Sequence, residues 1–309
     1  MSLAPLLWAG LAGAAALPAA REALRRPMDE AARADAPGSL AVLSQGTTHY
    51  QWLGRNTGPV AVCIHGLTTP SFVWHGLAPI LTEMGFRVLV YDLYGRGYSD
   101  RPRGAQTPAF FVRQLHDLLV HLKLHDDLTL IGYSMGGVIA AAYAAHYPHQ
   151  MRRAILVAPA GFDLHLGRLS DVAARWPVVG DWLFPLAYPR QMRTLWAEES
   201  AKPSSVPDLA ERMEQQLRLR GCLPAVLSSL RYTLRAPVPG IHRQLAAAQV
   251  PVGAIWGEDD TAVPISGMGL LAQWNRDARQ AQVAGAGHGL LYTHTPQVAD
   301  AIREVAGLI

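Results

Sequence analysis

The sequence has little cysteine, with only Cys63 and Cys222 among 309 residues. Two cysteines cannot build a framework of disulfide bridges, and they lack the spacing of metal-ligand pairs, so we interpret both as buried thiols. An excess of charge of one sign is also missing, because 27 basic and 24 acidic residues leave a formal net charge of +3. The arginines are scattered rather than gathered on one face, and we therefore expect no nucleic-acid partner.

The composition is that of a globular protein, with half of the residues hydrophobic and 17% charged. A length of 309 residues lies near the upper limit for a single hydrophobic core. We therefore predict one domain with an insertion rather than two independent domains.

Short apolar runs recur along the chain and predict the strands of a sheet. They lie at residues 60–64, 88–91, 128–131, 154–157 and 252–256, with a weaker run at 280–283. Runs that are apolar on both faces belong to a sheet covered on both sides, and helical patterns at 110–124 and 138–147 alternate with them. The predicted fold class is α/β, with a mostly parallel sheet and helices on both faces.

The alternation of strands and helices breaks between residues 162 and 249, where we predict an inserted helical cap, or lid. This insertion carries several prolines, a charged helical stretch and the aromatic residues Trp176, Trp182, Phe184, Tyr188 and Trp196. It precedes a late strand and is thus placed to cover the carboxyl edge of the sheet, where ligands bind in α/β proteins. The alternative is a second packing layer whose aromatic residues are only core. The predicted core comprises residues 39–161 and 250–309, after a linker at 27–38.

The N-terminal segment, residues 1–26, begins with an uncharged run at 3–20 that is followed by Arg21, Arg25 and Arg26. The run lies at the lower edge of the length that spans a bilayer. A secretory signal carries its positive charge before the apolar run. The arginines here follow it, which favours an uncleaved membrane anchor with the domain on the cytoplasmic side. Export after cleavage of a signal, and a helix packed on the domain, stay open.

A glycine-flanked serine follows the apolar run at 128–131, in the order Gly132-Tyr133-Ser134-Met135-Gly136, and an alanine-rich helical pattern comes next. Strand, turn and helix around G-x-S-x-G form the context of a nucleophile elbow. The turn is so tight that the residues two before and two after the serine must be very small, and both are glycine. The hydroxyl then lies at the positive end of a helix, where developing negative charge is stabilised. We predict that Ser134 is a nucleophile.

A serine nucleophile needs a base to take its proton, and the base needs a third group to orient it. Three consecutive acidic residues follow the run at 252–256, and we favour Asp260 over Glu258 and Asp259, which we expect to be solvated. His288 lies between two glycines after the last predicted strand, a place poorly suited to a core residue. We predict that His288 is the base and Asp260 its orienting acid.

Two backbone N–H groups are needed to hold the oxyanion of a tetrahedral intermediate. One is expected from Met135, directly after the serine, and the other from Leu67, in a loop where Gly66 lets the backbone approach the substrate. We interpret His65 as an organiser of this loop. The segment at 91–100 superficially suggests a dinucleotide loop, but it lacks the third glycine and a following helix, so we expect no cofactor.

Taken together, five motifs in this order resemble the α/β-hydrolase superfamily, from about residue 38 to the C-terminus. The motifs are His65-Gly66, Asp92-x-x-Gly95-x-Gly97-x-Ser99-Asp100, Gly132-x-Ser134-x-Gly136, Gly257-x-x-Asp260 and Gly287-His288. The elbow and the apolar N-terminus are similar to membrane-anchored monoacylglycerol lipases, and also to bacterial carbon-carbon bond hydrolases of meta-cleavage products. The latter usually place tryptophan after the histidine, where this chain has Gly289.

We therefore predict a serine hydrolase that cleaves carboxylic esters with apolar groups through an acyl-enzyme, without cofactor or metal. The expected partner is a small-molecule ester, with membrane contact through the N-terminal segment. The alternative activity is that of a carbon-carbon bond hydrolase, and a more distant one is a non-catalytic binding protein of the same fold. Neither the acyl chain length nor the oligomeric state follows from the sequence.

Overall fold

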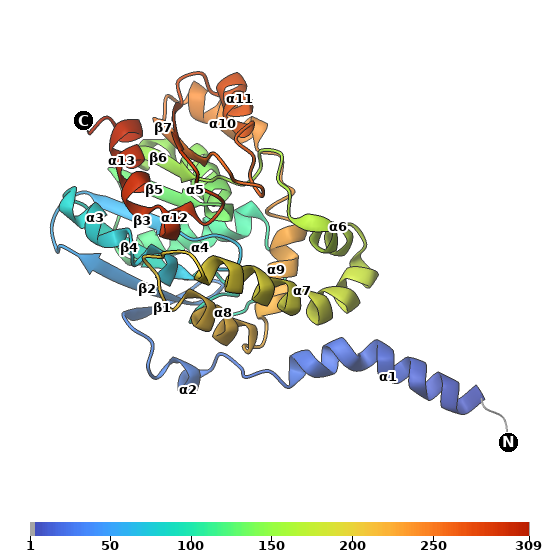
Figure 1. The fold of residues 1–309 in the computed structure, drawn as a ribbon. Coiled ribbons are helices and arrows are strands. Elements are labelled where there is room, and N and C mark those ends of the chain that lie inside the picture. Colours follow the sequence, from blue (N-terminus) through green and yellow to red (C-terminus); the bar gives the residue numbers. More distant parts are fainter. Residues whose placement is uncertain (1–3, 309) are drawn as a thin grey trace.

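A computed structural model describes residues 4–308 and shows one eight-stranded sheet with helices on both faces (Figure 1). The strand order is β1-β2-β4-β3-β5-β6-β7-β8. β2 pairs antiparallel with β1 and β4, and every other pairing is parallel. The predicted fold class is confirmed. The strands are β1 (Ser39–Leu43), β2 (Gly46–Gly54), β3 (Val60–Ile64), β4 (Arg87–Tyr91), β5 (Leu128–Tyr133), β6 (Met151–Val157), β7 (Val252–Gly257) and β8 (Arg279–Val283).

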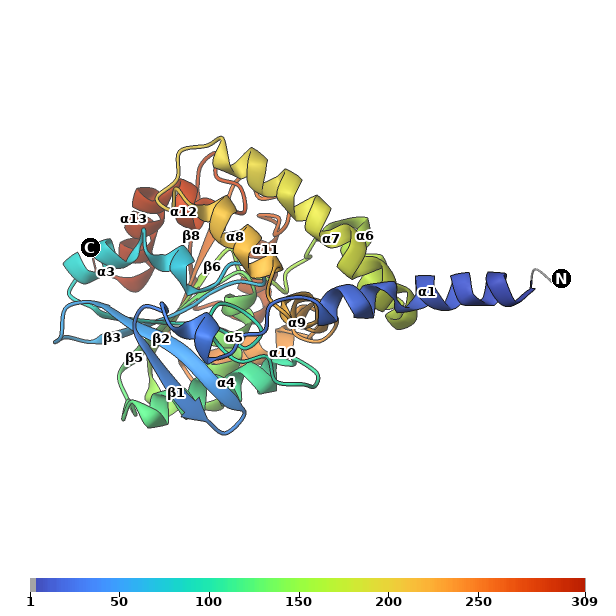
Figure 2. The ribbon, with the colours of Figure 1, turned by 90° about the horizontal axis from the view of Figure 1, so that it is seen from below.

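The middle of the sheet is the hydrophobic core. β3, β5 and β7 are buried at every residue, which is the burial that strands apolar on both faces require. In Figure 2, α3 and α13 lie on one face of the sheet, and α4 and α5 on the other. These layers comprise α3 (Ala78–Glu83), α4 (Pro108–His121), α5 (Met135–His146), α11 (Gly267–Trp274), α12 (Leu290–Thr293), α13 (Thr295–Ala306) and the short 3-10 helices η1 (Ser71–Trp74) and η2 (Pro148–Gln150).

The insertion between β6 and β7 folds into helices, as the sequence predicts. Four of them lie over the carboxyl edge of the sheet and form what we call the cap: α6 (Gly167–Arg175), α7 (Pro177–Ser200), α8 (Leu209–Leu217) and α9 (Cys222–Arg231). The fifth, α10 (Pro239–Ala247), packs instead against α5, where the side-chain amide of Gln244 donates to the Ala145 carbonyl at 3.1 Å. α10 is thus a helix of the layer beside the sheet, and the structural cap is shorter than the predicted 162–249.

The N-terminal segment forms α1 (Ala4–Ala23), and the predicted linker contains the short α2 (Glu30–Arg33). α1 projects away from the body of the molecule in both views and packs against α7 near its C-terminal end (Figures 1 and 2). The chain then pairs with the cap through Arg26, whose N–H donates to Arg218 and whose carbonyl accepts from Arg220. No helix within residues 4–308 is both long and apolar enough to cross a membrane, and the run in which we expected a spanning anchor is no exception.

Candidate active site

The turn between β5 and α5 places Ser134 in a strained backbone conformation, with φ of 53° and ψ of −117°. A non-glycine residue rarely adopts a positive φ, so the surrounding contacts must hold it there. The Ser134 N–H donates to the Val157 carbonyl at 2.9 Å, and its carbonyl accepts from Ala160 at 3.1 Å. A Cβ at Gly136 would lie 2.1 Å from the Ile64 carbonyl oxygen, and one at Gly132 2.3 Å from the Gly136 oxygen. Both glycines are thus required by close backbone approach.

Ser134, His288 and Asp260 come from three loops and meet in one line of hydrogen bonds. His288 Nε2 lies 3.0 Å from Ser134 Oγ, and His288 Nδ1 lies 2.8 Å from Asp260 Oδ2. Because a carboxylate accepts, the ring proton is on Nδ1, which leaves the Nε2 lone pair free for the serine proton. The structure brings these three predicted residues together, although they are separated by up to 154 positions in the sequence.

Asp260 is distinguished from its two acidic neighbours by burial and by the hydrogen bonds it accepts. It is 4% exposed, and its Oδ1 accepts from the N–H groups of Ala262 and Val263, each at 2.8 Å. Asp259 and Glu258 are exposed, and Glu258 instead accepts from Gly285 N–H at 2.9 Å. The carboxylate of Asp260 is therefore fixed in place with one oxygen turned to the histidine.

The backbone beside Ser134 has the layout expected of an oxyanion-binding loop. A Cβ at Gly66 would lie 3.4 Å from the Ser134 Cβ, so the loop after β3 passes directly against the serine. Leu67 follows in that loop and lines the same cavity as Ser134, and Met135 is the first residue of α5. Within residues 4–308, neither the Leu67 N–H nor the Met135 N–H donates to another protein group. Both donors are therefore available to a bound oxygen.

His65 is buried, and it hydrogen-bonds to backbone groups of the loops after β3 and β4 rather than to Ser134, Asp260 or His288. The Leu93 N–H donates to His65 Nε2 at 2.9 Å, so the ring proton is on Nδ1, which donates to the Gly66 carbonyl at 2.8 Å. Burial lowers the pKa of His65 to about 4. The ring is thus neutral at physiological pH and holds the loop after β3 against the loop after β4.

A buried ion pair that the sequence did not predict joins β2 to the loop after β4. His49 Nδ1 lies 2.7 Å from Asp92 Oδ2, and Asp92 also accepts from the N–H groups of Ser71 and Tyr98. Burial alone would raise the pKa of Asp92, but hydrogen bonding and the charge of His49 outweigh it and hold that pKa well below its usual range. This pair holds in place the loop after β4, which contains the motif at residues 92–100.

Arg96, in the same loop, is the positioning residue that sequence reasoning missed. Its guanidinium is fully buried and donates from Nε to the Leu67 carbonyl at 2.9 Å, and from its other nitrogens to Gln106 Oε1 at 2.6 Å and Ser229 Oγ at 2.8 Å. Burial lowers its pKa to about 10, so it stays charged at neutral pH. It thereby ties Leu67, whose N–H is the expected oxyanion donor, to α9 of the cap. Its place between Gly95 and Gly97 was the signal available in the sequence.

A cavity of about 540 Å³ lies over Ser134 and His288, between the loops of the sheet and the cap. One of its walls is polar. Tyr292 donates to Glu199 at 3.0 Å, and Lys202 lies 3.0 Å from the other oxygen of Glu199. A Cβ at Gly289 would lie 2.4 Å from Glu199 Oε2 and 2.7 Å from the Tyr292 hydroxyl. The carboxylate of Glu199 and the phenol of Tyr292 thus fill the space that a side chain larger than that of glycine would need at position 289.

Comparison with known proteins places the chain by family. The family described as alpha/beta hydrolase fold matches residues 59–295, which include Ser134, Asp260 and His288. The chain belongs to the alpha/beta hydrolase fold family. The resemblance drawn from the five motifs is therefore confirmed at the level of the superfamily.

Some curated relatives of this alpha/beta hydrolase carry names that state an activity, and others are named as uncharacterized. An uncharacterized protein of Mycobacterium tuberculosis is 28% identical over 68% of this chain, and the chain spans only 64% of that relative's length. Monoacylglycerol lipase ABHD6 of Homo sapiens is 24% identical over 78% of this chain and 74% of its own. A pimeloyl-[acyl-carrier protein] methyl ester esterase of Aromatoleum aromaticum is 27% identical over 80% of this chain and 98% of its own.

Solved structures share the fold of this alpha/beta hydrolase. A hydrolase from Pseudomonas aeruginosa PA01 superposes with a TM-score of 0.72 at 23% identity, over 88% of this chain and 99% of that one. The meta-cleavage product hydrolase CumD of Pseudomonas fluorescens IP01 superposes with a TM-score of 0.66 at 21% identity, over 88% and 98%. At this identity the likeness is one of fold.

Proposed function

We propose that the protein is a serine hydrolase that cleaves carboxylic esters with an apolar acyl or alcohol part. The single observation that carries the proposal is the position of His288, hydrogen-bonded to Ser134 at 3.0 Å and to Asp260 at 2.8 Å on the floor of a cavity. That arrangement activates a hydroxyl for attack on an acyl carbon. Relatives named as a monoacylglycerol lipase and a methyl ester esterase support an ester as the substrate.

In the first half of the proposed reaction, Ser134 Oγ attacks the ester carbonyl carbon while His288 Nε2 takes its proton. Asp260 stabilises the imidazolium that forms. The carbonyl oxygen becomes an oxyanion, and the N–H groups of Leu67 and Met135 hold it. The tetrahedral intermediate then collapses, and the C–O bond to the alcohol breaks as His288 returns the proton to the leaving oxygen. The product of this half is an acyl-enzyme on Ser134 and a free alcohol.

In the second half, water attacks the acyl carbon, and His288 takes one of its protons. The second tetrahedral intermediate uses the same two backbone donors. Collapse releases the carboxylic acid, and the proton on His288 returns to Ser134 Oγ. Because the Arg96 side chain holds the Leu67 carbonyl, the Leu67 N–H on the preceding peptide plane keeps its direction through both halves.

The alternative, hydrolysis of a carbon-carbon bond, is less well supported by the cavity. The position after His288 is Gly289, and Glu199 and Tyr292 occupy the room where a tryptophan ring would extend. A non-catalytic binding role does not require the hydrogen-bonded line from Asp260 to Ser134. Ester hydrolysis accounts for both observations.

Turnover of p-nitrophenyl esters tests the proposal directly. The wild-type protein is expected to hydrolyse p-nitrophenyl butyrate, and Ser134→Ala to lower kcat/KM by about 10⁴-fold or more with an unchanged circular dichroism spectrum. A meta-cleavage product should be turned over at least 100-fold more slowly than the ester. Equal ester turnover by wild type and Ser134→Ala would refute the proposal, and faster turnover of the meta-cleavage product would favour the alternative.

A further inference from the structure

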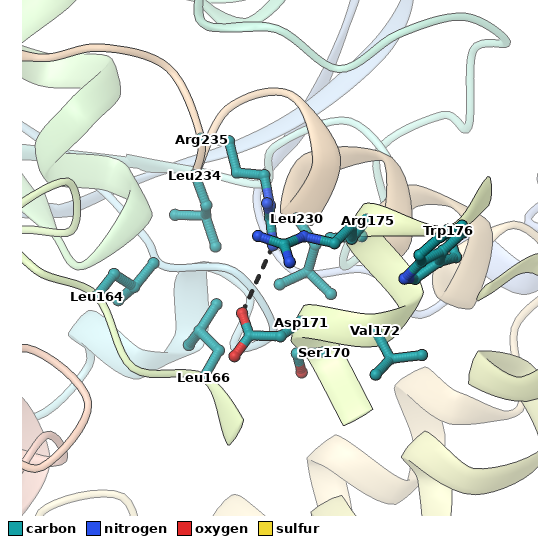
Figure 3. A pocket seen from close by; sticks show the side chains of 11 residues that line it. Leu164, Leu166, Ser170, Asp171, Val172, Arg175, Trp176, Leu230, Leu234 and Arg235 are labelled. Carbon is teal, nitrogen blue, oxygen red and sulfur yellow. Dashed lines mark ion pairs between the residues drawn. The ribbon is translucent and has the colours of Figure 1, made fainter. Parts of the chain in front are cut away.

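A second cavity, of about 550 Å³, lies between α6 and α9 of the cap (Figure 3). In Figure 3, Leu164, Leu166 and Leu234 lie on one side of this cavity and Trp176 on the other. None of the residues proposed for catalysis lines it. Its volume is about that of the cavity over the serine, which is large for a packing defect.

The two cavities share one wall. Five residues line both of them, and four of the five are leucines: Leu164, Leu166, Leu230, Leu234 and Ser170. The backbone at the edge of this wall is fixed, because His165 N–H donates to the Ala262 carbonyl at 2.8 Å. The partition between the cavities is therefore made by aliphatic side chains, which change rotamer without moving the backbone.

The far side of the second cavity is open and polar. Arg235 lies 3.5 Å from Asp171 there, and Arg175 and Trp176 line the same rim. The Trp176 side chain is 60% exposed. A ligand that passes the shared leucines thus contacts aliphatic side chains first. At the far end of the cavity it reaches a rim that is charged and exposed to solvent.

Another part of the catalytic cavity has a polar wall. Glu199 bonds to Tyr292 and Lys202 there, and an aliphatic chain placed against Glu199, whose side chain is 16% exposed, would take a carboxylate out of water. Burying such a group against an apolar chain is costly. The leucine wall therefore suits an apolar chain better than the wall beside Glu199 does.

We propose that the long aliphatic chain of the ester substrate passes between the wall leucines, and that its distal part occupies the second cavity. The proposal rests on the proposed function, because the chain starts at the acyl carbon held on Ser134. It names the substrate class as esters of long, unbranched fatty acids, with Leu164, Leu166, Leu230 and Leu234 as the residues that set chain length. The acyl chains of short esters do not reach the shared leucines, so they do not enter the second cavity.

The test compares two leucine-to-tryptophan variants, with the ratio of kcat/KM for p-nitrophenyl dodecanoate to that for the butyrate as the readout. Leu166 belongs to the shared wall, whereas Leu195 lines only the catalytic cavity. Leu166→Trp should lower the ratio at least tenfold because the indole closes the passage, and Leu195→Trp should change it by less than threefold. Leu166→Ala, which widens the passage, should raise the ratio and keeps the test valid if Leu166→Trp does not fold.

The outcomes separate this inference from the proposed function. If the wild type hydrolyses neither ester, the proposed function itself fails. If butyrate is hydrolysed but the ratio is unchanged in Leu166→Trp and Leu166→Ala, or if Leu195→Trp lowers it more than Leu166→Trp does, the chain does not run through the second cavity. A tenfold lower ratio in Leu166→Trp alone, or a higher ratio in Leu166→Ala, supports the assignment.

Discussion

The loops around Ser134 and the cap above them are built in different ways. The loops are fixed by backbone contacts that leave no room, as at Gly136, where an added Cβ would lie 2.1 Å from the Ile64 oxygen. The cap exposes Trp176, Val178 and Trp182, and its longest helix, α7, contains two internal prolines. Rigid loops hold reacting atoms to the accuracy that catalysis needs, whereas the cap contributes side chains that line both cavities. The difference suggests that chemistry and selectivity reside in separate parts of the chain.

The largest effect should come from the acid within the rigid loops. Asp260→Asn is expected to lower kcat by about 10⁴-fold, because an amide no longer stabilises the required tautomer or the imidazolium of His288. Asp259→Asn, next to it but exposed, serves as the matched control and should change kcat by less than threefold. Steady-state kinetics with p-nitrophenyl butyrate measures both. Equal losses, or a larger loss in Asp259→Asn, would mean that Asp260 is not the carboxylate that orients the histidine.

The next effect concerns Arg96, which joins the two regions. Arg96→Met leaves the buried Leu67 carbonyl without its donor, at about 1–3 kcal/mol, whereas Gln106 Oε1 still accepts from the Ser229 hydroxyl at 2.7 Å. We expect a lower Tm and a kcat reduced more than KM is raised, since the Leu67 donor acts mainly in the transition state. The control is Arg101→Met, because the Arg101 guanidinium, among residues 4–308, donates only to the carbonyls of Ser99 and Gly97 in its own loop. A loss of Tm with kcat intact would give Arg96 a purely structural role.

A smaller effect is expected from His242, in the helix layer away from the site. Burial lowers its pKa to about 4, from about 6.5 in the unfolded chain. The stabilisation from the neutral ring is therefore fully present above pH 6.5 and is lost as the pH falls toward 4, because the unfolded chain then binds a proton that the folded one does not. His242→Phe should reduce the drop in Tm between pH 7 and pH 5. An unchanged drop would place the acid sensitivity elsewhere, for example at His65.

The smallest effect on catalysis should follow from removing α1. A chain beginning at Pro27 loses the contact of Glu22 with the Gly221 N–H but no group proposed for the reaction, so kcat/KM should stay within about twofold of the full chain. Membrane association stays a prediction, now argued from the exposed Trp8 and Leu17 of an apolar helix that arginines follow. Flotation with anionic lipid vesicles checks it. The full chain should float and the shorter one should not; a full chain that stays at the bottom would contradict this prediction.

Strands and site residues could be predicted from the sequence where a local pattern of residues determines the structure. Each of the strands β3 to β8 overlaps an apolar run that predicts it, although β6 begins at Met151, three residues before its run, because ladder pairing to β5 continues past the buried part. Ser134, Asp260 and His288 were identifiable because tight turns need glycine and because a histidine between glycines is unsuited to a core. Their roles remain a proposal.

What the sequence did not predict depends on contacts between distant segments. Arg96 bonds to Ser229, 133 positions away, and no local pattern marks that pairing. The same holds for α10, which lies within the predicted cap range but whose place beside α5 is set by packing. The second cavity lies where α6 meets α9, and periodicity alone does not fix how these two helices pack.

Labelling with a fluorophosphonate probe tests the central claim, that His288 and Asp260 activate Ser134 as a nucleophile. Intact mass spectrometry should show one adduct per wild-type chain, and peptide mapping should place it on Ser134. Ser134→Ala should take up no probe, and His288→Ala should react at least 100-fold more slowly, while both variants keep the wild-type Tm within a few degrees. Equal labelling of wild type and Ser134→Ala, or an adduct on another residue, would contradict the account.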